Sequence, residues 1–146
     1  NYACFGKKDY QQLKVIEAMV RALNFDISII PVDIERSLQG LALSSRNGYL
    51  SQDQKMHALQ LSQTLQAMKQ QIEEASSNGH LTTEYYHNLE KEMTQLLQSN
   101  DFEVDYLAIR DQKLLKIPSE GEKFLVILVA AKVANTRLLD NIEVFL

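Results

Sequence analysis

The sequence has a single cysteine, no excess of basic residues and no hydrophobic run long enough to span a bilayer. One cysteine, Cys4, rules out an internal disulfide and fits a reducing compartment, so we expect a cytoplasmic protein in which Cys4 packs within an apolar strand. The longest apolar run, residues 124–131, is too short for a membrane helix, and we expect no secretory signal because core-like sequence starts at Asn1. A net charge of −4 argues against nucleic-acid or anionic-membrane partners, which usually require a basic stripe.

The histidines and the cysteine also lack the spacing that is typical of metal ligands. His57, His80 and His87 do not form a helical i, i+3 or i, i+4 pair, and no second cysteine is present, so we expect no transition-metal site. The chain also has no internal repeat or low-complexity segment. Its 146 residues, 45% hydrophobic and 23% charged, are typical of a soluble globular chain with one ordinary domain or two small ones.

The first informative stretch is a predicted strand-to-helix turn. Residues 2–5 predict the end of a buried strand that stops at Gly6. A helix then begins near Asp9, which has the spacing of a capping box with Gln12. Apolar residues follow at helical spacing: Leu13, Ile16, Val20 and Leu23.

Gly6, Lys7 and Lys8 therefore lie where a helix presents unpaired backbone N–H groups and the positive end of its dipole. A glycine lets a ligand approach the backbone and a lysine adds charge, so the turn is suited to holding phosphate. The alternative is an ordinary connection with solvated lysines, in which Asp9 serves only as a helix cap.

The second informative stretch is residues 40–50, which follow a predicted strand at residues 27–30 that Pro31 ends. Ser44 and Ser45 offer hydroxyls and Arg46 a permanently charged guanidinium, while Asn47 and Gly48 favour a tight turn. This stretch is either a polyphosphate-binding loop or an ordinary surface loop. Strand, helix and strand form a right-handed βαβ unit whose ligands bind at the carboxyl ends of the strands, so both stretches should face one crevice.

The rest of the chain predicts a separate α+β module. A long helix starts at a capping box of Ser51 and Gln54 and ends at residues 78–79, and a second helix starts at Thr82 or Thr83. We expect the methionines to fill the core. Strands are predicted at residues 104–109, 124–131 and 142–145, with a short edge piece at residues 113–117, and they form an antiparallel sheet. We place the domain boundary between residues 1–49 and 50–146.

Two blocks of the sequence resemble the signature blocks of a known family. Residues 4–12, CFGKKDYQQ, and 40–50, GLALSSRNGYL, closely resemble two signature blocks of the pantothenate synthetase (pantoate-β-alanine ligase) family. Residues 127–131 and 136–141 resemble that family's closing segment. The resemblance implies the last βαβ segment of a Rossmann-like nucleotidyl-transferase domain, followed by a small α+β lid domain with two helices and an antiparallel sheet.

The resemblance also implies a reaction. Such enzymes are AMP-forming acid-amine ligases: they condense pantoate with β-alanine through a pantoyl adenylate, giving pantothenate, AMP and pyrophosphate, and magnesium accompanies the ATP. The implied partners are these small molecules, with a homodimer as a further expectation.

The family's roles carry over residue by residue. Gln12 would bind pantoate, and Lys8, Ser44, Ser45 and Arg46 would be the catalytic residues, neutralising or hydrogen-bonding charge on the α-phosphate and pyrophosphate. No metal ligand falls in this chain. The implied ATP contacts are Gly6, Lys7, Lys8, Asp9, Glu35, Leu43, Ser44, Ser45 and Arg46.

The chain departs from the family pattern in four places. Lys7 stands where the family usually has an acid, Asp33 where proline is expected, Glu35 where an apolar residue is usual and Gln39 where aspartate is expected. The family's amino-terminal half, with its His-x-Gly-His motif, a further substrate glutamine and the acidic magnesium-binding segment, is also absent. We therefore expect these residues to form the carboxy-terminal portion of the enzyme and to be inactive alone. The competing expectation is a non-catalytic nucleotide-binding or self-association module that uses an exposed sheet edge.

Overall fold

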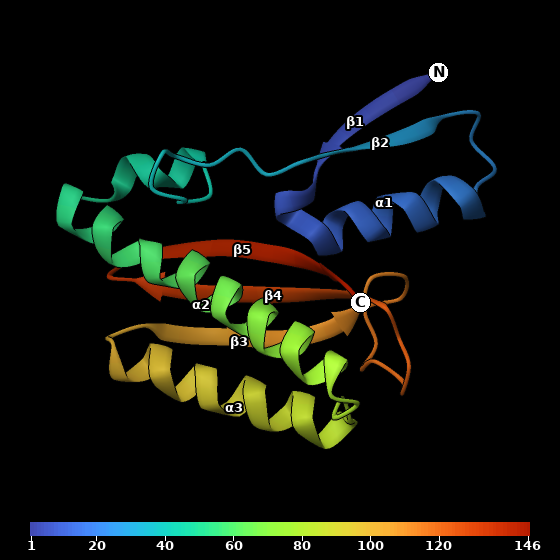
Figure 1. The fold of residues 1–146 in the computed structure, drawn as a ribbon. Coiled ribbons are helices and arrows are strands. Elements are labelled where there is room, and N and C mark those ends of the chain that lie inside the picture. Colours follow the sequence, from blue (N-terminus) through green and yellow to red (C-terminus); the bar gives the residue numbers. More distant parts are fainter.

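Two separate sheets organise the structure, a computed structural model that describes residues 1–146. One is a parallel pair, β1-β2, and the other an antiparallel sheet in the order β3-β4-β5 (Figure 1). The elements in chain order are β1 (Tyr2–Gly6), the 3₁₀ turn η1 (Lys7–Asp9), α1 (Tyr10–Ala22), β2 (Ser28–Val32), the 3₁₀ turn η2 (Ser45–Tyr49), α2 (Gln52–Ser77), α3 (Thr83–Ser99), β3 (Glu103–Asp111), β4 (Phe124–Val133) and β5 (Thr136–Phe145).

The first sheet is the predicted βαβ unit. β1 and β2 run parallel, and α1 is the crossover between them. The sequence predicted that Pro31 ends β2, and this is wrong: Pro31 lies within β2, opposite Phe5. An edge strand tolerates a residue without an N–H donor. The prediction that Cys4 is packed is wrong: Cys4 is exposed, because β1 pairs only with β2 and alternates exposed and half-buried positions.

The start of α1 also differs from the prediction. Asp9 is the N-cap residue but its side chain makes no capping hydrogen bond, so the expected capping box with Gln12 does not form. The turn η1 leads directly into the helix and holds Asp9 at φ −90° and ψ 64°, away from the extended geometry that a capping side chain requires. Only the first turns of α1 are buried, at Tyr10 and Leu13, and Leu23 is 58% exposed.

Local end signals set the limits of the two later helices as predicted. Ser51 and Gln54 form a complete capping box at α2, and the Thr82 hydroxyl accepts from the Tyr85 N–H at α3. After α2, Gly79 takes φ +70°, a left-handed conformation that glycine adopts without strain.

The strand predicted at residues 113–117 is absent. These residues form a loop between β3 and β4, because the Asp111 carboxylate accepts hydrogen bonds from the backbone N–H groups of Lys113, Leu114 and Lys116. Those bonds turn the chain away from the sheet. β5 is longer than predicted and includes residues 136–141.

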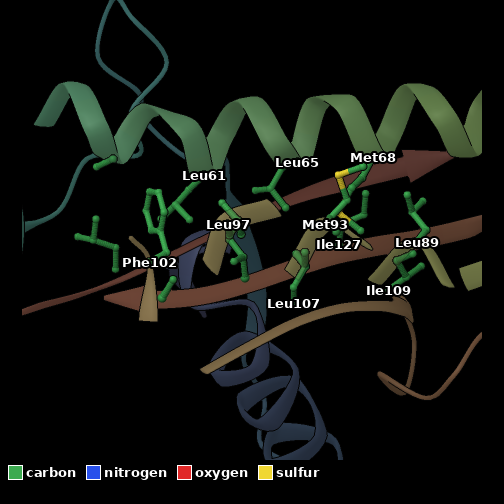
Figure 2. Packing of buried hydrophobic residues seen from close by; sticks show 14 of the residues in the cluster. Leu61, Leu65, Met68, Leu89, Met93, Leu97, Phe102, Leu107, Ile109 and Ile127 are labelled. Atoms are coloured by element: carbon green, nitrogen blue, oxygen red, sulfur yellow. The ribbon is translucent and has the colours of Figure 1, made fainter. Parts of the chain in front are cut away.

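The main core lies between the antiparallel sheet and the helices α2 and α3. Figure 2 shows Leu61, Leu65 and Met68 pointing from α2 toward the strands, where Leu107 and Ile127 lie. Met68 and Met93 are core residues as predicted, whereas Met19 and Met56 are 45% and 54% exposed, so the prediction is wrong for those two.

The opposite face of the same sheet is covered by the start of α1. Tyr10 packs there against Val126 and Leu128 of β4. β4 is therefore buried on both faces, which explains its unbroken apolar run. β5, one of the two edge strands of this sheet, lies beside the βαβ unit (Figure 1).

The fold class predicted from the sequence is confirmed: a βαβ unit is followed by two helices and an antiparallel sheet. No helix is both long and apolar enough to cross a membrane.

Candidate functional site

Strand β5 holds the two predicted phosphate-binding stretches in place. From one position on β5, the Asn141 side-chain amide donates to the backbone carbonyls of Lys7 at 2.8 Å and Lys8 at 3.0 Å. From the adjacent position, the Asp140 carboxylate accepts two hydrogen bonds of 2.8 Å from Arg36. Both β5 side chains are buried.

Arg36 extends this contact to the loop of residues 40–50. Its guanidinium also donates to the Gly40 carbonyl at 3.0 Å, where Gly40 takes φ +102°, and to the Asn141 carbonyl at 3.2 Å. The planar fork of arginine can satisfy several acceptors at once, whereas the lysine ammonium cannot present this geometry. Arg36 thus fixes the start of the loop against β5.

The loop itself is ordered by short internal contacts. The Ser44 hydroxyl donates to Asn47 Oδ1 at 2.9 Å, and Asn47 Nδ2 donates to the Ala42 carbonyl at 3.1 Å. Asn47 and Gly48 lie in a tight turn as predicted, the 3₁₀ turn η2, in which the Leu50 N–H donates to the Asn47 carbonyl at 3.3 Å and Gly48 does not take positive φ. Ser45 and Arg46 are exposed in this turn.

Lys8 is the predicted site residue that borders both stretches. It lines a cavity of about 130 Å³ together with Gln12 and Asn141, and a narrower pocket together with Ser44. Burial lowers the pKa of its ammonium, and the charge of Arg46 lowers it further, whereas Asp9 and Asp140 act in the opposite direction. Burial is the largest of these effects, so the Lys8 ammonium is poorly solvated, and a bound anion would favour its charged form.

Lys7 has a different environment. Its Nζ lies 2.8 Å from Asp33 and 2.9 Å from Glu143, and these hydrogen bonds raise the pKa of the Lys7 ammonium. Asp33 and Lys7 are two of the four departures from the family pattern, and they pair with each other. The Lys7 side chain is thus engaged by carboxylates, and only its backbone is left for a ligand.

Tyr10 adds a second hydrogen bond to Glu143. Its hydroxyl donates to Glu143 Oε1 at 2.9 Å. Burial, and then the charge of Glu143, raise the pKa of the Tyr10 phenol well above its ordinary value. The Tyr10 hydroxyl consequently stays protonated and works as a donor that fixes Glu143.

The other predicted residues are placed around these contacts. Gly6, Asp9 and Gln12 are exposed at the β1-α1 turn, and a Cβ at Gly6 would meet no atom within 4 Å. The Leu43 N–H donates to the Glu35 carbonyl at 2.9 Å, which joins these two residues through their backbones. No group of three or more His, Cys, Asp and Glu side chains is arranged to hold a metal ion.

The sequence did not identify the residues whose hydrogen bonds and ion pairs hold the candidate site in place: Tyr10, Arg36, Asp140, Asn141 and Glu143. A signal was present for two of them, since adjacent Asp140 and Asn141 interrupt an otherwise largely apolar strand and a buried polar side chain needs a partner. Nothing in the sequence identified those partners, which are more than 100 positions away.

The family profile and the relatives that match this chain all belong to one kind of enzyme. The sequence profile of the family described as Pantoate-beta-alanine ligase matches residues 1–143. Pantothenate synthetases from Laribacter hongkongensis and Chromobacterium violaceum are 43% and 46% identical over 143 residues, which cover 98% of this chain and 49% of each relative.

Solved structures of the same kind of enzyme match the fold of this chain. A pantothenate synthetase from Thermus thermophilus matches 99% of this chain and 50% of its own chain, with 36% identity and a TM-score of 0.84. A Francisella tularensis pantoate-beta-alanine ligase, complexed with beta-gamma ATP and beta-alanine, shares the fold over 97% of this chain and 43% of its own, with 23% identity and a TM-score of 0.66.

The matched proteins are ligases by name. The chain belongs to the pantoate-beta-alanine ligase family. It spans about half the length of the curated relatives that it matches.

Proposed function

We propose that this chain provides the carboxy-terminal half of the site of an ATP-dependent ligase, which joins pantoate to β-alanine through a pantoyl adenylate and releases AMP and pyrophosphate. The observation that carries this proposal is that Lys8 and Ser44, from two separate stretches, line one pocket, while Lys8 also lines an adjoining cavity with Gln12. A lysine and a serine hydroxyl at one pocket, with the Arg46 guanidinium on the same loop as Ser44, favour a polyanionic ligand.

The residues have distinct roles in this proposal. Lys8 and Arg46 neutralise charge that develops on the α-phosphate and on the departing pyrophosphate. The Ser45 hydroxyl donates a hydrogen bond to a phosphate oxygen, and the Ser44 hydroxyl does so after it turns away from Asn47 Oδ1. Gln12, which shares a cavity with Lys8, both donates to and accepts from pantoate. No protein nucleophile is needed, because the pantoate carboxylate attacks the α-phosphorus directly. The remaining nucleotide contacts come from Gly6, Lys7, Asp9, Glu35 and Leu43, with Lys7 and Glu35 acting through their backbones.

Magnesium would accompany the ATP and offset phosphate charge. Its protein ligands would lie outside this chain, in the part of the relatives that the chain does not span. For the same reason we propose that the isolated chain binds nucleotide but does not complete the reaction. Pantothenate formation by the chain alone would overturn this part of the proposal.

We further propose that residues 1–49 and 50–146 are two domains, with the second acting as a lid. The support for a mobile lid is that β5 meets the βαβ unit mainly through hydrogen bonds and ion pairs, beside one small apolar contact at Tyr10, and such contacts open more easily than an apolar core. X-ray scattering of the chain with and without ATP tests this: compaction on binding is expected, and unchanged dimensions would count against a lid.

Equilibrium binding of ATP to this chain tests the nucleotide site. Lys8→Ala and Arg46→Ala should each weaken binding at least about tenfold, since a charge-assisted hydrogen bond contributes about 1.5–3 kcal/mol. Lys91→Ala and Arg21→Ala, at exposed positions outside both pockets that Lys8 lines, are the matched controls and should leave affinity unchanged. Equal affinity in all four variants would refute the phosphate roles assigned here.

A second proposal concerns self-association of this chain. β1 pairs with β2 along one edge only, and its other edge carries no proline to block pairing. Tyr2, Leu23 and Phe25 expose 79%, 58% and 50% of their surface in the same unit. We expect sedimentation to detect a dimer that Tyr2→Lys weakens and that Phe145→Lys, on the other sheet, does not. A monomer at every concentration would contradict this proposal.

A further inference from the structure

The carbonyl groups of the β1-α1 turn are held by a side chain from the other sheet. Asn141 is 3% exposed and uses both hydrogens of its amide, one on Lys7 O and one on Lys8 O. An asparagine side chain has two such donors, so this contact exhausts them. The peptide unit from which the Lys8 side chain extends is therefore tied directly to β5.

The position of Asn141 itself is fixed by its strand. It lies opposite Leu128 in the antiparallel pairing of β4 with β5, and the Asn141 N–H donates to the Asp140 carboxylate at 2.7 Å. Asp140 in turn holds Arg36, which binds the Gly40 carbonyl at the start of the loop of residues 40–50. Two consecutive residues of β5 thus set the distance between the Lys8 turn and that loop.

We infer that Asn141 is a positioning residue for the nucleotide site, one that holds the Lys8 turn in register with the loop of residues 40–50 without touching the ligand itself. This inference rests on the proposed function, because it assigns a role at the same site. Its physical basis is preorganisation: a cation held in place before binding loses little conformational freedom when the phosphate arrives. Without the amide, the turn would have to be ordered by the ligand.

The variants change the hydrogen-bonding capacity of residue 141 and leave the charge of the chain unchanged. Asn141→Leu has nearly the same shape, is neutral and leaves two carbonyls without their donor. Asn141→Ser keeps one hydroxyl donor and should recover part of the function. Asn135→Leu, at the exposed turn between β4 and β5, is the matched control.

The test is ATP binding to the wild-type chain and to these variants, with the unfolding free energy of each measured separately in urea. We expect Asn141→Leu to bind ATP about tenfold more weakly while remaining folded, which corresponds to the loss of one or two hydrogen bonds. Asn141→Ser should lie between it and the wild type, and Asn135→Leu should bind normally. In ¹⁵N-resolved NMR spectra, the backbone signals of Lys8 and Asp9 should shift in Asn141→Leu and keep their wild-type positions in Asn135→Leu.

Three outcomes would overturn the inference. If Asn141→Leu lowers stability but folded protein binds ATP like the wild type, Asn141 is structural only. If Asn141→Leu does not fold, Asn141→Ser decides, and normal ATP affinity in that variant rejects the inference. If the wild-type chain does not bind ATP, the proposed function fails and the inference with it, whereas the first two outcomes leave the proposed function intact.

Discussion

Arg36 and Asp140 are joined by two parallel hydrogen bonds of 2.8 Å, although 104 positions separate them in sequence. The Asp140 side chain is almost fully buried, and Arg36 supplies its counter-charge. The pair links the segment after β2 to the edge of the antiparallel sheet, and several expectations about stability and binding follow from it and its neighbours.

Arg36→Ala should lower the unfolding free energy by about 3 kcal/mol, because it leaves a buried carboxylate without a counter-charge. Arg36→Lys should recover only part of the loss, since lysine cannot form the paired bonds. Urea unfolding measures both. Arg137→Ala removes a more exposed ion pair with Asp105 and serves as the control, with a loss of no more than about 1 kcal/mol. Equal losses at the two arginines would contradict the role given to burial.

Lys8 should make ATP binding pH-dependent on the alkaline side. Burial lowers the pKa of its ammonium below 10.5, so the free protein loses this proton earlier than an ordinary lysine does, and bound phosphate favours its return. Proton uptake on binding should therefore appear as the pH rises toward 10.5, and ATP affinity should fall there. Calorimetry in two buffers of different ionisation enthalpy measures the uptake. Lys8→Arg, which stays charged, should show neither effect, and uptake that persists in that variant would assign the proton to another group.

Tyr10→Phe should cost about 1.5 kcal/mol at neutral pH, through loss of the hydrogen bond to Glu143. The pKa of Tyr10 is raised in the folded chain by burial first and by Glu143 second, so above about pH 10 the unfolded chain releases this proton before the folded chain does. Stability should fall with rising pH in the wild type, and less steeply in Tyr10→Phe. Thermal unfolding against pH checks this. Tyr49→Phe, at an exposed position, should behave like the wild type.

Gly6→Ala and Gly79→Ala should have opposite effects. Gly6 has φ −71° and open space around a new Cβ, so alanine should leave stability unchanged or slightly higher. The same methyl group would stand where phosphate is proposed to approach, and ATP affinity should drop. Gly79 has φ +70° far from the site, so alanine should cost about 1 kcal/mol and leave affinity unchanged. Normal ATP binding by Gly6→Ala would remove this glycine from the site.

Sequence reasoning succeeds where the signal and its partner lie within a few residues. Ser51 and Gln54 form their capping box because both belong to one helix end. Asp9 and Gln12 have the same spacing and fail, because a 3₁₀ turn precedes α1 and changes the backbone angles at Asp9. The strand predicted at residues 113–117 fails because one carboxylate, that of Asp111, turns the backbone, and residue propensities do not capture such a contact.

For the candidate site, the sequence indicated that the Lys8 turn and the loop of residues 40–50 should converge, and Lys8 and Ser44 do line one pocket. It did not indicate what holds them there. Asn141 and Asp140 act across two sheets, and side-chain pairing at that distance depends on how the sheets pack, which no local pattern encodes. Lys7 and Asp33 each follow a residue of the pair Gly6 and Val32 in the β1-β2 sheet, so their contact depends on the register of these two strands, which the sequence pattern did not specify.

The alternation of side chains along β5 bears on how this hairpin folds. Leu138 and Val144 belong to the apolar core on one face, whereas Asn141 and Glu143 contact the βαβ unit from the other. A slip of one residue against β4 would exchange the two sets, driving an amide and a carboxylate into hydrocarbon and pushing leucine and valine against polar groups. A misaligned β4-β5 hairpin would thus lose both its apolar packing and its polar contacts. The residues that stabilise the candidate site therefore also favour the correct register of β5 against β4.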